Sequence, residues 1–502
     1  MTEPINIAHL RQRQAGILLH ISSLPSAYGV GDLGLEALRF IDLLSKLGVK
    51  VWQILPINMP HADNSPYQCL SAHAGNPDFI SLETLEFQGL LSKEDLAEPV
   101  VNKSKLLIKA YQAFHQQDKP PLHLQFSEFC TKEAHWLDDF ALFLALRVQF
   151  NQLGWAYWPE VYKCRDEITM QMAKTELVEE IAAIKFTQFI FFNQWMALKS
   201  YAGSKGIQFF GDIPIFVAYD SADVWANSNL FKLDEAKNMT VVAGVPPDYF
   251  SATGQRWGNP HYNWEVMQSE DFSWWVSRMT TQNALFDMVR IDHFRGLEAA
   301  WEIPINEETA FNGHWVEAPG CSLLKAIKRS LPSITLIAED LGIITEEVEA
   351  LRESYHLPGM KILQFAFSGQ EDNPYLPQNI EVDSVVYTGT HDNDTTIGWY
   401  QSLDDYHREQ VHAYLRSVYS HDHQVNMPRD LIELAFGTKA YLAIIPMQDL
   451  LALDGHHRMN TPGTASGNWN WRFDWSQLTT EQEEFFAGVV ERTGRKNNPS
   501  AI

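Results

Sequence analysis

Four carboxyl side chains of this sequence come directly after short apolar runs, at positions where parallel strands would end. They are Asp212 after IQFFG, Asp292 after MVRI, Glu339 after TLIA and Asp392 after VVYTGTH. Because the carboxyl ends of barrel strands meet at one mouth, we expect these acids to converge. Retaining cleavage of a glycosidic bond requires one ionised and one protonated carboxyl group about 5 to 5.5 Å apart. The acids therefore predict a carbohydrate-active site.

The neighbours of two of these acids predict different protonation states for them. Arg290 and Asp292 lie on the same face of a strand, since side chains alternate along it. We expect the guanidinium to lower the pKa of Asp292 and keep it ionised, as a nucleophile must be. The apolar residues before Glu339 predict a raised pKa and a protonated general acid. Asp392 would hold sugar hydroxyls beside the reacting carbon, where hydrogen bonds strengthen in the transition state.

Eight β-rich apolar runs can place these acids at one end of a sheet. In chain order they cover residues 14–21, 49–56, 207–214, 287–294, 335–342, 360–367, 384–392 and 439–446. Near-continuous apolar strands that alternate with helical segments are typical of a parallel sheet covered on both faces. Eight of them predict an α/β fold, a (β/α)8 or TIM barrel, with its chemistry at the carboxyl ends of the strands.

Two long gaps between these runs predict insertions into a single catalytic unit that spans residues 1–502. Residues 82–204 have the pattern of amphipathic helices, which predicts an inserted helical subdomain. The second insertion, residues 216–286, contains GVPPDYFSATGQRWGNPHYNW at 244–264. This segment is dense in Gly, Pro and aromatic residues, so we expect a structured loop without regular helix or strand. Long ordered loops are usually functional, and this one is expected to border the active site.

Composition and charge exclude several classes of partner. The 502 residues carry 63 acidic and 38 basic side chains, a net charge of −25. Such a chain repels phosphate backbones and anionic lipid, so we expect neither nucleic acid nor a membrane as partner. Neither a signal peptide nor an apolar run near the ~18 residues of a membrane span is visible. We expect a cytoplasmic protein whose four scattered cysteines are buried free thiols.

Six segments of the chain resemble the 4-α-glucanotransferases, the amylomaltase or disproportionating-enzyme family of the α-amylase clan. They are SPYQCLSAHAGNP (65–77), GDIPIFV (211–217), the segment 244–264, RIDHFRG (290–296), IAEDLG (337–342) and THDN (390–393). The matches run in family order from about Gly16 to Asn460. Many amylases have Asp-x-x-x-Asn-His where this chain continues from Asp212 as IPIFV. That departure is shared by the glucanotransferases, so it favours them over an amylase.

The resemblance implies a function and a role for each site residue. It implies that α-1,4-glucan segments from malto-oligosaccharides are transferred to the 4-hydroxyl of another glucan or of glucose by a retaining double displacement, without metal or cofactor. Asp292 would be the nucleophile, Glu339 the general acid/base and Asp392 the transition-state stabiliser. The remaining residues would bind sugar: Tyr67, Asp212, Arg290 and His391 around the reacting glucose, and Trp257, His293 and Asn460 toward the acceptor.

Two other functions are compatible with the same barrel. An α-glucan hydrolase of this clan would shorten maltotriose without building longer oligomers. A catalytically inactive glucan-binding or regulatory protein would be expected to lack one of the three catalytic acids, and all three are present. A single acid at a strand end is commonly a helix N-cap or part of a surface ion pair. The sequence leaves the oligomeric state and the preferred glucan length open.

Three further motifs are expected to be structural. The pairs His421/His423 and His456/His457 have no cysteine or spaced third ligand beside them, so we interpret them as surface residues rather than metal ligands. The run GVGDLG (29–34) resembles a dinucleotide-binding loop, but no suitable ribose-binding acid follows about 20 residues later. It is interpreted as a sugar-site loop or helix start. The aromatic run 186–195 has helical spacing and is expected to be core.

Overall fold

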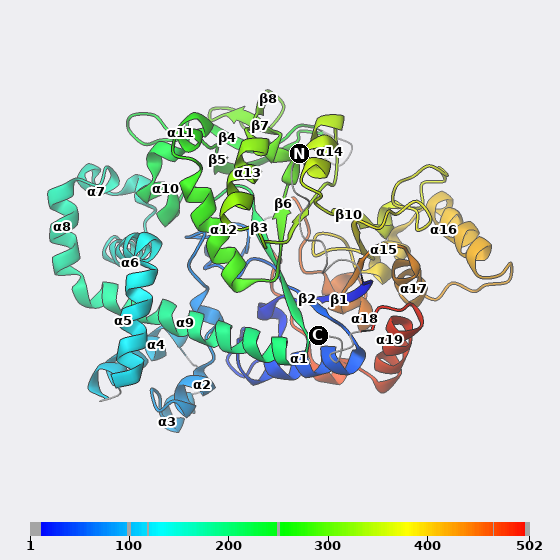
Figure 1. The fold of residues 1–502 in the computed structure, drawn as a ribbon, viewed down its shortest axis with the longest axis horizontal. Helices are drawn as coiled ribbons and strands as arrows, with labels where there is room; N and C mark the ends of the chain where they lie inside the picture. Colours follow the sequence, from blue (N-terminus) through cyan, green and yellow to red (C-terminus); the bar gives the residue numbers. More distant parts are fainter. Residues whose placement is uncertain (1–11, 98–101, 118–119, 248–251, 465, 497–502) are drawn as a thin grey trace.

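An eight-stranded parallel sheet forms the centre of the computed structural model, which describes residues 12–97, 102–117, 120–247, 252–464 and 466–496 (Figure 1). Its strands follow the order β10-β11-β12-β1-β2-β3-β6-β9. They are β1 (Gln14–Leu18), β2 (Val51–Gln53), β3 (Gln208–Pro214), β6 (Met288–Asp292), β9 (Leu336–Ala338), β10 (Gly359–Ile362), β11 (Ser384–Tyr387) and β12 (Leu442–Pro446). The Ala338 N–H donates to the Pro358 carbonyl at 2.9 Å, which joins the two edges of the sheet. Each predicted run overlaps one strand, with β10 beginning one residue before its run, and the predicted TIM barrel is confirmed.

The strands are apolar on both faces because both faces are buried. Side chains on the inner face fill the barrel; they include Leu18, Val51, Phe210, Met288, Ile337, Met360, Val385 and Ile444. Side chains on the outer face belong to the larger core beneath the helices. The helices outside the two insertions are α1 (Leu35–Leu47), α13 (Gly320–Ser330), α14 (Glu346–Ser354), α15 (Thr396–Ser402), α16 (Asp405–Val418), α17 (Arg429–Gly437), α18 (Met447–Leu450) and α19 (Thr480–Arg492). The barrel therefore has a packed interior, and its chemistry is confined to its ends.

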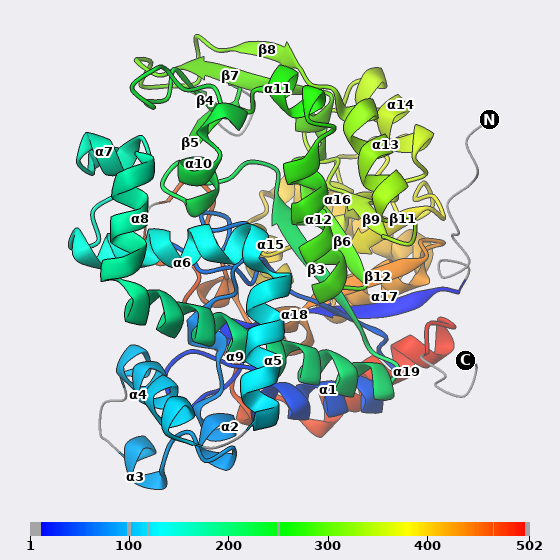
Figure 2. The ribbon, with the colours of Figure 1, turned by 60° about the vertical axis from the view of Figure 1, so that its left-hand side comes forward.

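The described part of residues 82–204 contains helices and short 3-10 turns but no strand. Figure 2 shows these helices together on one side of the barrel. They are α2 (Leu82–Phe87), α3 (Lys93–Leu96), α4 (Lys103–Gln116), α5 (Pro120–Lys132), α6 (Ala134–Gln149), α7 (Glu160–Lys163), α8 (Glu167–Glu176) and α9 (Val178–Ser204). Phe186, Phe189 and Trp195 of α9 are buried, which confirms the core interpretation of that aromatic run. The division of the chain into subdomains stays a prediction.

The second insertion forms part of a four-stranded antiparallel sheet, which the sequence did not predict. The order is β5-β4-β7-β8, with β4 (Val241–Val245), β5 (Gln255–Pro260), β7 (Ala299–Pro304) and β8 (His314–Glu317). The insertion also contains α10 (Ala222–Ala226), α11 (Trp264–Ser269) and α12 (Ser273–Leu285). The expectation of a loop without regular strand over 244–264 is therefore wrong for β5 and the end of β4.

The glycines and prolines of this segment are compatible with strands because of where they lie. A Cβ on Gly244 would stand 2.1 Å from the Gln255 carbonyl oxygen, so the close pairing of β4 with β5 requires glycine. Pro260 ends β5, which is an edge strand, where proline removes no hydrogen bond that the sheet needs. Tyr249 and Phe250, two aromatic residues expected in the loop, lie outside the described residues.

Two expectations about the whole chain are answered by the structure. Among the described residues, no helix is both long and apolar enough to cross a membrane. All four cysteines are free, as predicted. Burial was predicted for all of them, but only Cys69 is buried, whereas Cys164 and Cys321 are exposed. Both exposed thiols lie on short surface helices or their ends, where spacing alone gave no information on burial.

Candidate active site

A cleft of about 980 Å³ opens at the carboxyl ends of the barrel strands. Most of the predicted site residues line it: Tyr67, Trp257, Arg290, Asp292, His293, Glu339, Asp392 and Asn460. The remaining two, Asp212 and His391, lie behind Tyr67. The Tyr67 hydroxyl donates to Asp212 Oδ2 at 2.7 Å and lies 2.9 Å from His391 Nε2. The structure thus brings all ten predicted residues to one site.

The strand register places Asp292 and Glu339 side by side. Strands β6 and β9 are paired in parallel, with Ile291 opposite Ala338. The Glu339 N–H donates to the Ile291 carbonyl at 3.1 Å, so the pairing continues to the two acids. Neighbouring strands lie about 4.8 Å apart. Both carboxyl groups therefore enter the same cleft from adjacent strands, while their predicted separation of about 5 to 5.5 Å stays a prediction.

Arg290 joins two of the acids beneath the cleft. Its Nη2 lies 2.8 Å from Asp292 Oδ1, and its Nη1 lies 2.6 Å from Asp212 Oδ2. The predicted lowering of the Asp292 pKa is nevertheless wrong, because burial raises that pKa to about 6. Removal from water disfavours the ionised form, and the negative charges of Asp212 and Asp392 add to this effect. The attraction of Arg290 opposes both contributions without overcoming them.

Glu339 has a higher pKa than Asp292, in the direction that the sequence predicted. Burial, together with the charge of Asp292, raises the pKa of Glu339 to about 8 against the lowering effect of Arg290. Two main-chain groups hold the carboxyl group: the His293 N–H donates to Oε2 at 2.6 Å, and the Leu341 N–H donates to Oε1 at 3.0 Å. Near neutral pH, Asp292 is mostly ionised and Glu339 mostly protonated.

The backbone of His293 explains how it reaches Glu339. His293 has a φ of 52°, a left-handed conformation that turns the chain directly after β6. Its ring packs edge-on against Trp257, with ring centroids 4.8 Å apart. His293 is therefore in contact with both Glu339 and Trp257, the aromatic residue of β5 that borders the cleft.

Asp392 is half-buried and is held in its ionised form by its neighbours. Burial raises its pKa, but His391 and the Asn460 amide more than compensate and hold it well below its ordinary value. His391 Nε2 lies 3.2 Å from Asp392 Oδ2, and Asn460 Nδ2 donates to Asp392 Oδ1 at 2.6 Å. Asp392 is thus a fixed negative charge at the edge of the cleft.

The cleft also contains aromatic residues that the sequence reasoning missed. Trp469 lies 6.0 Å from both Tyr67 and His391 between ring centroids, and Trp315 and Phe365 line other walls. A signal for Trp469 existed, because TPGTASGNWNW after Asn460 has the same Gly and aromatic density as the segment 244–264. Trp315 and Phe365 have no such local signal.

The other candidate motifs have local partners. His423 lies 3.1 Å from Asp430, and His457 lies 3.0 Å from Asp454. Over the described ranges, no group of three or more His, Cys, Asp or Glu side chains could hold a metal ion. The Gly34 N–H donates to Asp32 Oδ1 at 2.9 Å at the beginning of α1, in agreement with a helix start at this motif.

Comparisons with known proteins agree over nearly the whole length of the chain. A family model described as 4-alpha-glucanotransferase matches residues 19–479. A 4-alpha-glucanotransferase of Thermus thermophilus is 46% identical over 497 residues, covering 96% of this chain and 99% of the relative. One of Synechocystis sp. is 44% identical, covering 97% and 99%. The structure of an amylomaltase from Streptococcus agalactiae in complex with acarbose is similar, with a TM-score of 0.92 at 36% identity, covering 97% of this chain and 100% of that one.

Proposed function

Because the chain belongs to the 4-alpha-glucanotransferase family, we propose that its cleft cuts an α-1,4-glucan and transfers the released segment to the 4-hydroxyl of another glucan or of glucose. The family membership makes the chain a glycosyltransferase that acts on α-glucans. One observation carries the assignment of the chemistry: Asp292 and Glu339 end neighbouring strands and have pKa values of about 6 and about 8. That is the division between nucleophile and acid that a retaining reaction needs.

The first displacement uses these two groups together. Glu339 donates its proton to the glycosidic oxygen as the bond from that oxygen to the anomeric carbon breaks. Asp292 attacks the same carbon and forms a β-linked ester with the sugar. The leaving glucan departs with the proton, and Glu339 remains as a carboxylate. The His293 and Leu341 N–H groups stabilise that carboxylate.

The second displacement reverses the first with a new partner. The 4-hydroxyl of an acceptor sugar enters, and Glu339 removes its proton. The acceptor oxygen attacks the anomeric carbon and releases Asp292, which restores an α linkage. Asp392 stabilises the positive charge on the sugar ring in both steps. Tyr67 and Arg290 border the reacting glucose, with Asp212 and His391 holding the Tyr67 hydroxyl from behind. Trp257, His293 and Asn460 face the acceptor.

Transfer requires that water be kept from the covalent intermediate, since water is present at about 55 M. The segment 244–264 is our candidate for this role, because Trp257 lines the cleft and packs against His293. An acceptor held against these rings would occupy the place from which water attacks.

An incubation with maltotriose tests the proposal. A transferase yields glucose together with a ladder of longer oligomers, and Asp292→Asn, which lacks the nucleophile, yields neither. The alternative, an α-glucan hydrolase of the same clan, yields shorter products alone. Formation of products by Asp292→Asn at the rate of the unchanged chain would contradict the role of Asp292. The cytoplasmic location, the lack of nucleic-acid and membrane partners and the glucan length preference stay predictions.

A further inference from the structure

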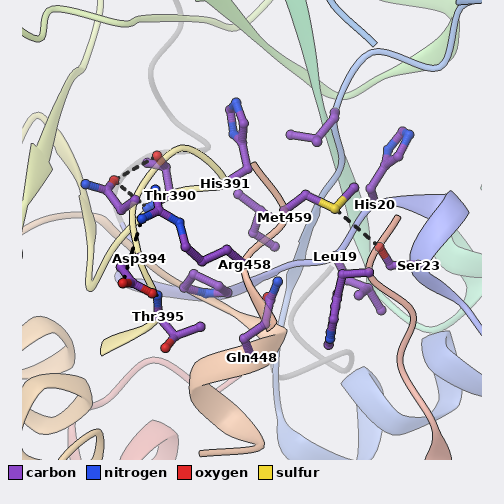
Figure 3. A pocket seen from close by; sticks show the side chains of 15 residues that line it. Leu19, His20, Ser23, Thr390, His391, Asp394, Thr395, Gln448, Arg458 and Met459 are labelled. Atoms are coloured by element: carbon purple, nitrogen blue, oxygen red, sulfur yellow. Dashed lines mark hydrogen bonds and ion pairs between the residues drawn. The ribbon is translucent and has the colours of Figure 1, made fainter. Parts of the chain in front are cut away.

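Arg458 lies directly beneath the catalytic cleft without lining it. It borders a small enclosed cavity of about 20 Å³ together with His391, Asp394 and Gln448 (Figure 3). The Arg458 side chain is 25% exposed, so its guanidinium is largely held by protein atoms.

The guanidinium of Arg458 binds the main chain of two site residues. Its Nη2 donates to the Asp392 carbonyl at 3.0 Å, and its Nε donates to the Asn460 carbonyl at 3.2 Å. These are the residues whose side chains pair in the cleft, where Asn460 Nδ2 donates to Asp392 Oδ1 at 2.6 Å. Asp392 and Asn460 are therefore joined twice, through their side chains and through one arginine below.

Asp394 forms an ion pair with the remaining nitrogen of the guanidinium, Nη1. Its Oδ2 lies 3.7 Å from Arg458 Nη1, and its Oδ1 accepts from the Thr395 N–H at 2.8 Å. The Asp394 carbonyl in turn accepts from Gln364 Nε2 at 2.8 Å. The loop after β11 is thereby tied both to the segment that carries Asn460 and to the 3-10 turn after β10.

We propose that Arg458 is a positioning residue of the transfer reaction: it fixes Asp392 against Asn460 so that the Asp392 carboxylate faces the reacting sugar. This inference rests on the proposed function. A planar guanidinium is suited to the task because its donors form a rigid fork that reaches two carbonyls at once. The barrel strands fix Asp292 and Glu339, whereas Asp392 and Asn460 lie on loops and depend on such a contact.

The test compares Arg458→Met and Arg458→Lys with the unchanged chain, using maltotriose as substrate. We expect Arg458→Met to lower kcat about 10- to 100-fold, with KM changed less than about threefold, because Asp392 acts mainly in the transition state. Arg458→Lys should recover part of the loss, since an ammonium group can still bind one of the carbonyls. Arg408→Met is the matched control: Arg408 donates to the Leu403 carbonyl at 2.7 Å beside α16, away from the cleft, and its loss should leave kcat unchanged.

A double variant separates positioning from general destabilisation. If Arg458 acts through the Asp392–Asn460 pair, Arg458→Met combined with Asn460→Ala should lose little more kcat than Asn460→Ala alone. Three outcomes would overturn the proposal: kcat losses of the two single variants that multiply in the double variant, an unchanged kcat in Arg458→Met, or a change in KM alone. If circular dichroism shows that Arg458→Met is unfolded, Asp394→Asn is tested in its place. We expect this variant to lower kcat about 3- to 10-fold. An unchanged kcat in that variant would overturn the proposal too.

The experiment also distinguishes this inference from the function on which it rests. An unchanged chain that makes no oligomer ladder contradicts the proposed function. An active unchanged chain beside a fully active, folded Arg458→Met contradicts only the role of Arg458.

Discussion

Asp292 and Glu339 share one buried environment, yet they bind their protons with different strength. Both lose water, which raises both pKa values. Asp292 has the Arg290 guanidinium at 2.8 Å, whereas Glu339 has two main-chain N–H groups as its hydrogen-bond donors. A full positive charge at contact distance stabilises a carboxylate more than neutral donors do. Arg290 lowers both pKa values, and Asp292 is the one of the two acids that it contacts at ion-pair distance.

The pH dependence of the reaction should follow from these values. The proposed mechanism requires ionised Asp292 and protonated Glu339, so kcat/KM on maltotriose should rise through pH about 6 and fall through pH about 8. Initial rates from pH 4 to pH 10 give the profile. Glu339→Gln, measured with a substrate whose leaving group needs no proton, should lose the alkaline decline. A profile that is flat across pH 6 to 8.5 in the unchanged chain would contradict the assignment of roles.

Glu339 should also make stability depend on pH. Its pKa rises from 4.5 in the unfolded chain to about 8 in the folded one, so folding binds a proton between these values. Stability from this group is complete below pH 4.5 and is lost as pH rises to 8, by up to about 1.4 kcal/mol per pH unit. The Tm of Glu339→Gln relative to the unchanged chain should therefore increase from pH 5 to pH 8. The exposed Glu371→Gln is the control, and a Tm difference independent of pH in Glu339→Gln would refute the prediction.

The sequence predicts some properties of the individual site residues and not others. Strand alternation correctly placed Arg290 beside Asp292, because it needs only the local pattern. The predicted direction of the Asp292 pKa was wrong because the pKa is raised by burial in the folded chain and by the charges of Asp212 and Asp392, which are distant in the sequence. The sequence did not predict a role for Arg458, because Arg458 donates to main-chain carbonyl groups. Every residue has such a carbonyl, so the residue types give no signal for this contact.

At the level of elements, β5 brings an aromatic residue from the antiparallel sheet to the mouth of the parallel barrel. Trp257 stands in the middle of this edge strand and contacts His293, the residue after β6. The strands β4 and β5 alternate poorly in polarity and contain one glycine each, so their sequence resembles a loop. They form a sheet because β4 pairs with β7, which lies about 60 residues further along the chain. A local sequence pattern cannot reveal such a distant partner.

Removing the Trp257 ring should shift the reaction toward hydrolysis. In Trp257→Ala, the acceptor sugar loses a contact surface and water gains access to the covalent intermediate. We expect the ratio of hydrolysis to transfer to increase about 3- to 10-fold, because an aromatic contact contributes about 1 kcal/mol. Glucose release and oligomer formation from maltotriose measure the ratio. The control is Phe87→Ala, which removes a ring that is 90% exposed on α2 and should leave the ratio of hydrolysis to transfer unchanged. The same ratio in both variants would count against the role of Trp257.

At the level of the whole molecule, Arg495 joins the end of the described chain to its beginning. The side chain is 1% exposed and follows α19. Its guanidinium donates to the Gln14 carbonyl of β1 at 2.9 Å, to the Phe436 carbonyl at 2.9 Å and to the Thr438 carbonyl at 3.1 Å. The barrel thus begins and ends at one buried cation.

Arg495→Met should destabilise the fold without changing the chemistry. It removes one donor from each of three carbonyl groups, although those of Phe436 and Thr438 also accept from Arg13 Nη2, each at 2.6 Å. A buried polar group that loses its hydrogen bond costs about 1 to 3 kcal/mol. We expect a loss of about 1 to 3 kcal/mol in the free energy of unfolding, with kcat unchanged at temperatures where the variant is folded. Arg492→Met, which breaks an ion pair of a half-exposed arginine with Glu433, should cost less than about 1 kcal/mol. Equal midpoints of denaturant unfolding for the two variants would contradict this account.

The pairing of β6 with β9 has a consequence for the composition of the product mixture. In the proposed mechanism the paired strands present both carboxyl groups to one sugar, whose anomeric carbon is bonded first to the glycosidic oxygen, then to Asp292 and then to the acceptor oxygen. Each linkage that is cut is replaced by an identical one, so the number of linkages is conserved and almost no heat is exchanged. What drives the reaction is then the entropy of mixing. Left to equilibrium, a single pure oligomer should spread into a geometric series of lengths whose mean is fixed by the starting material.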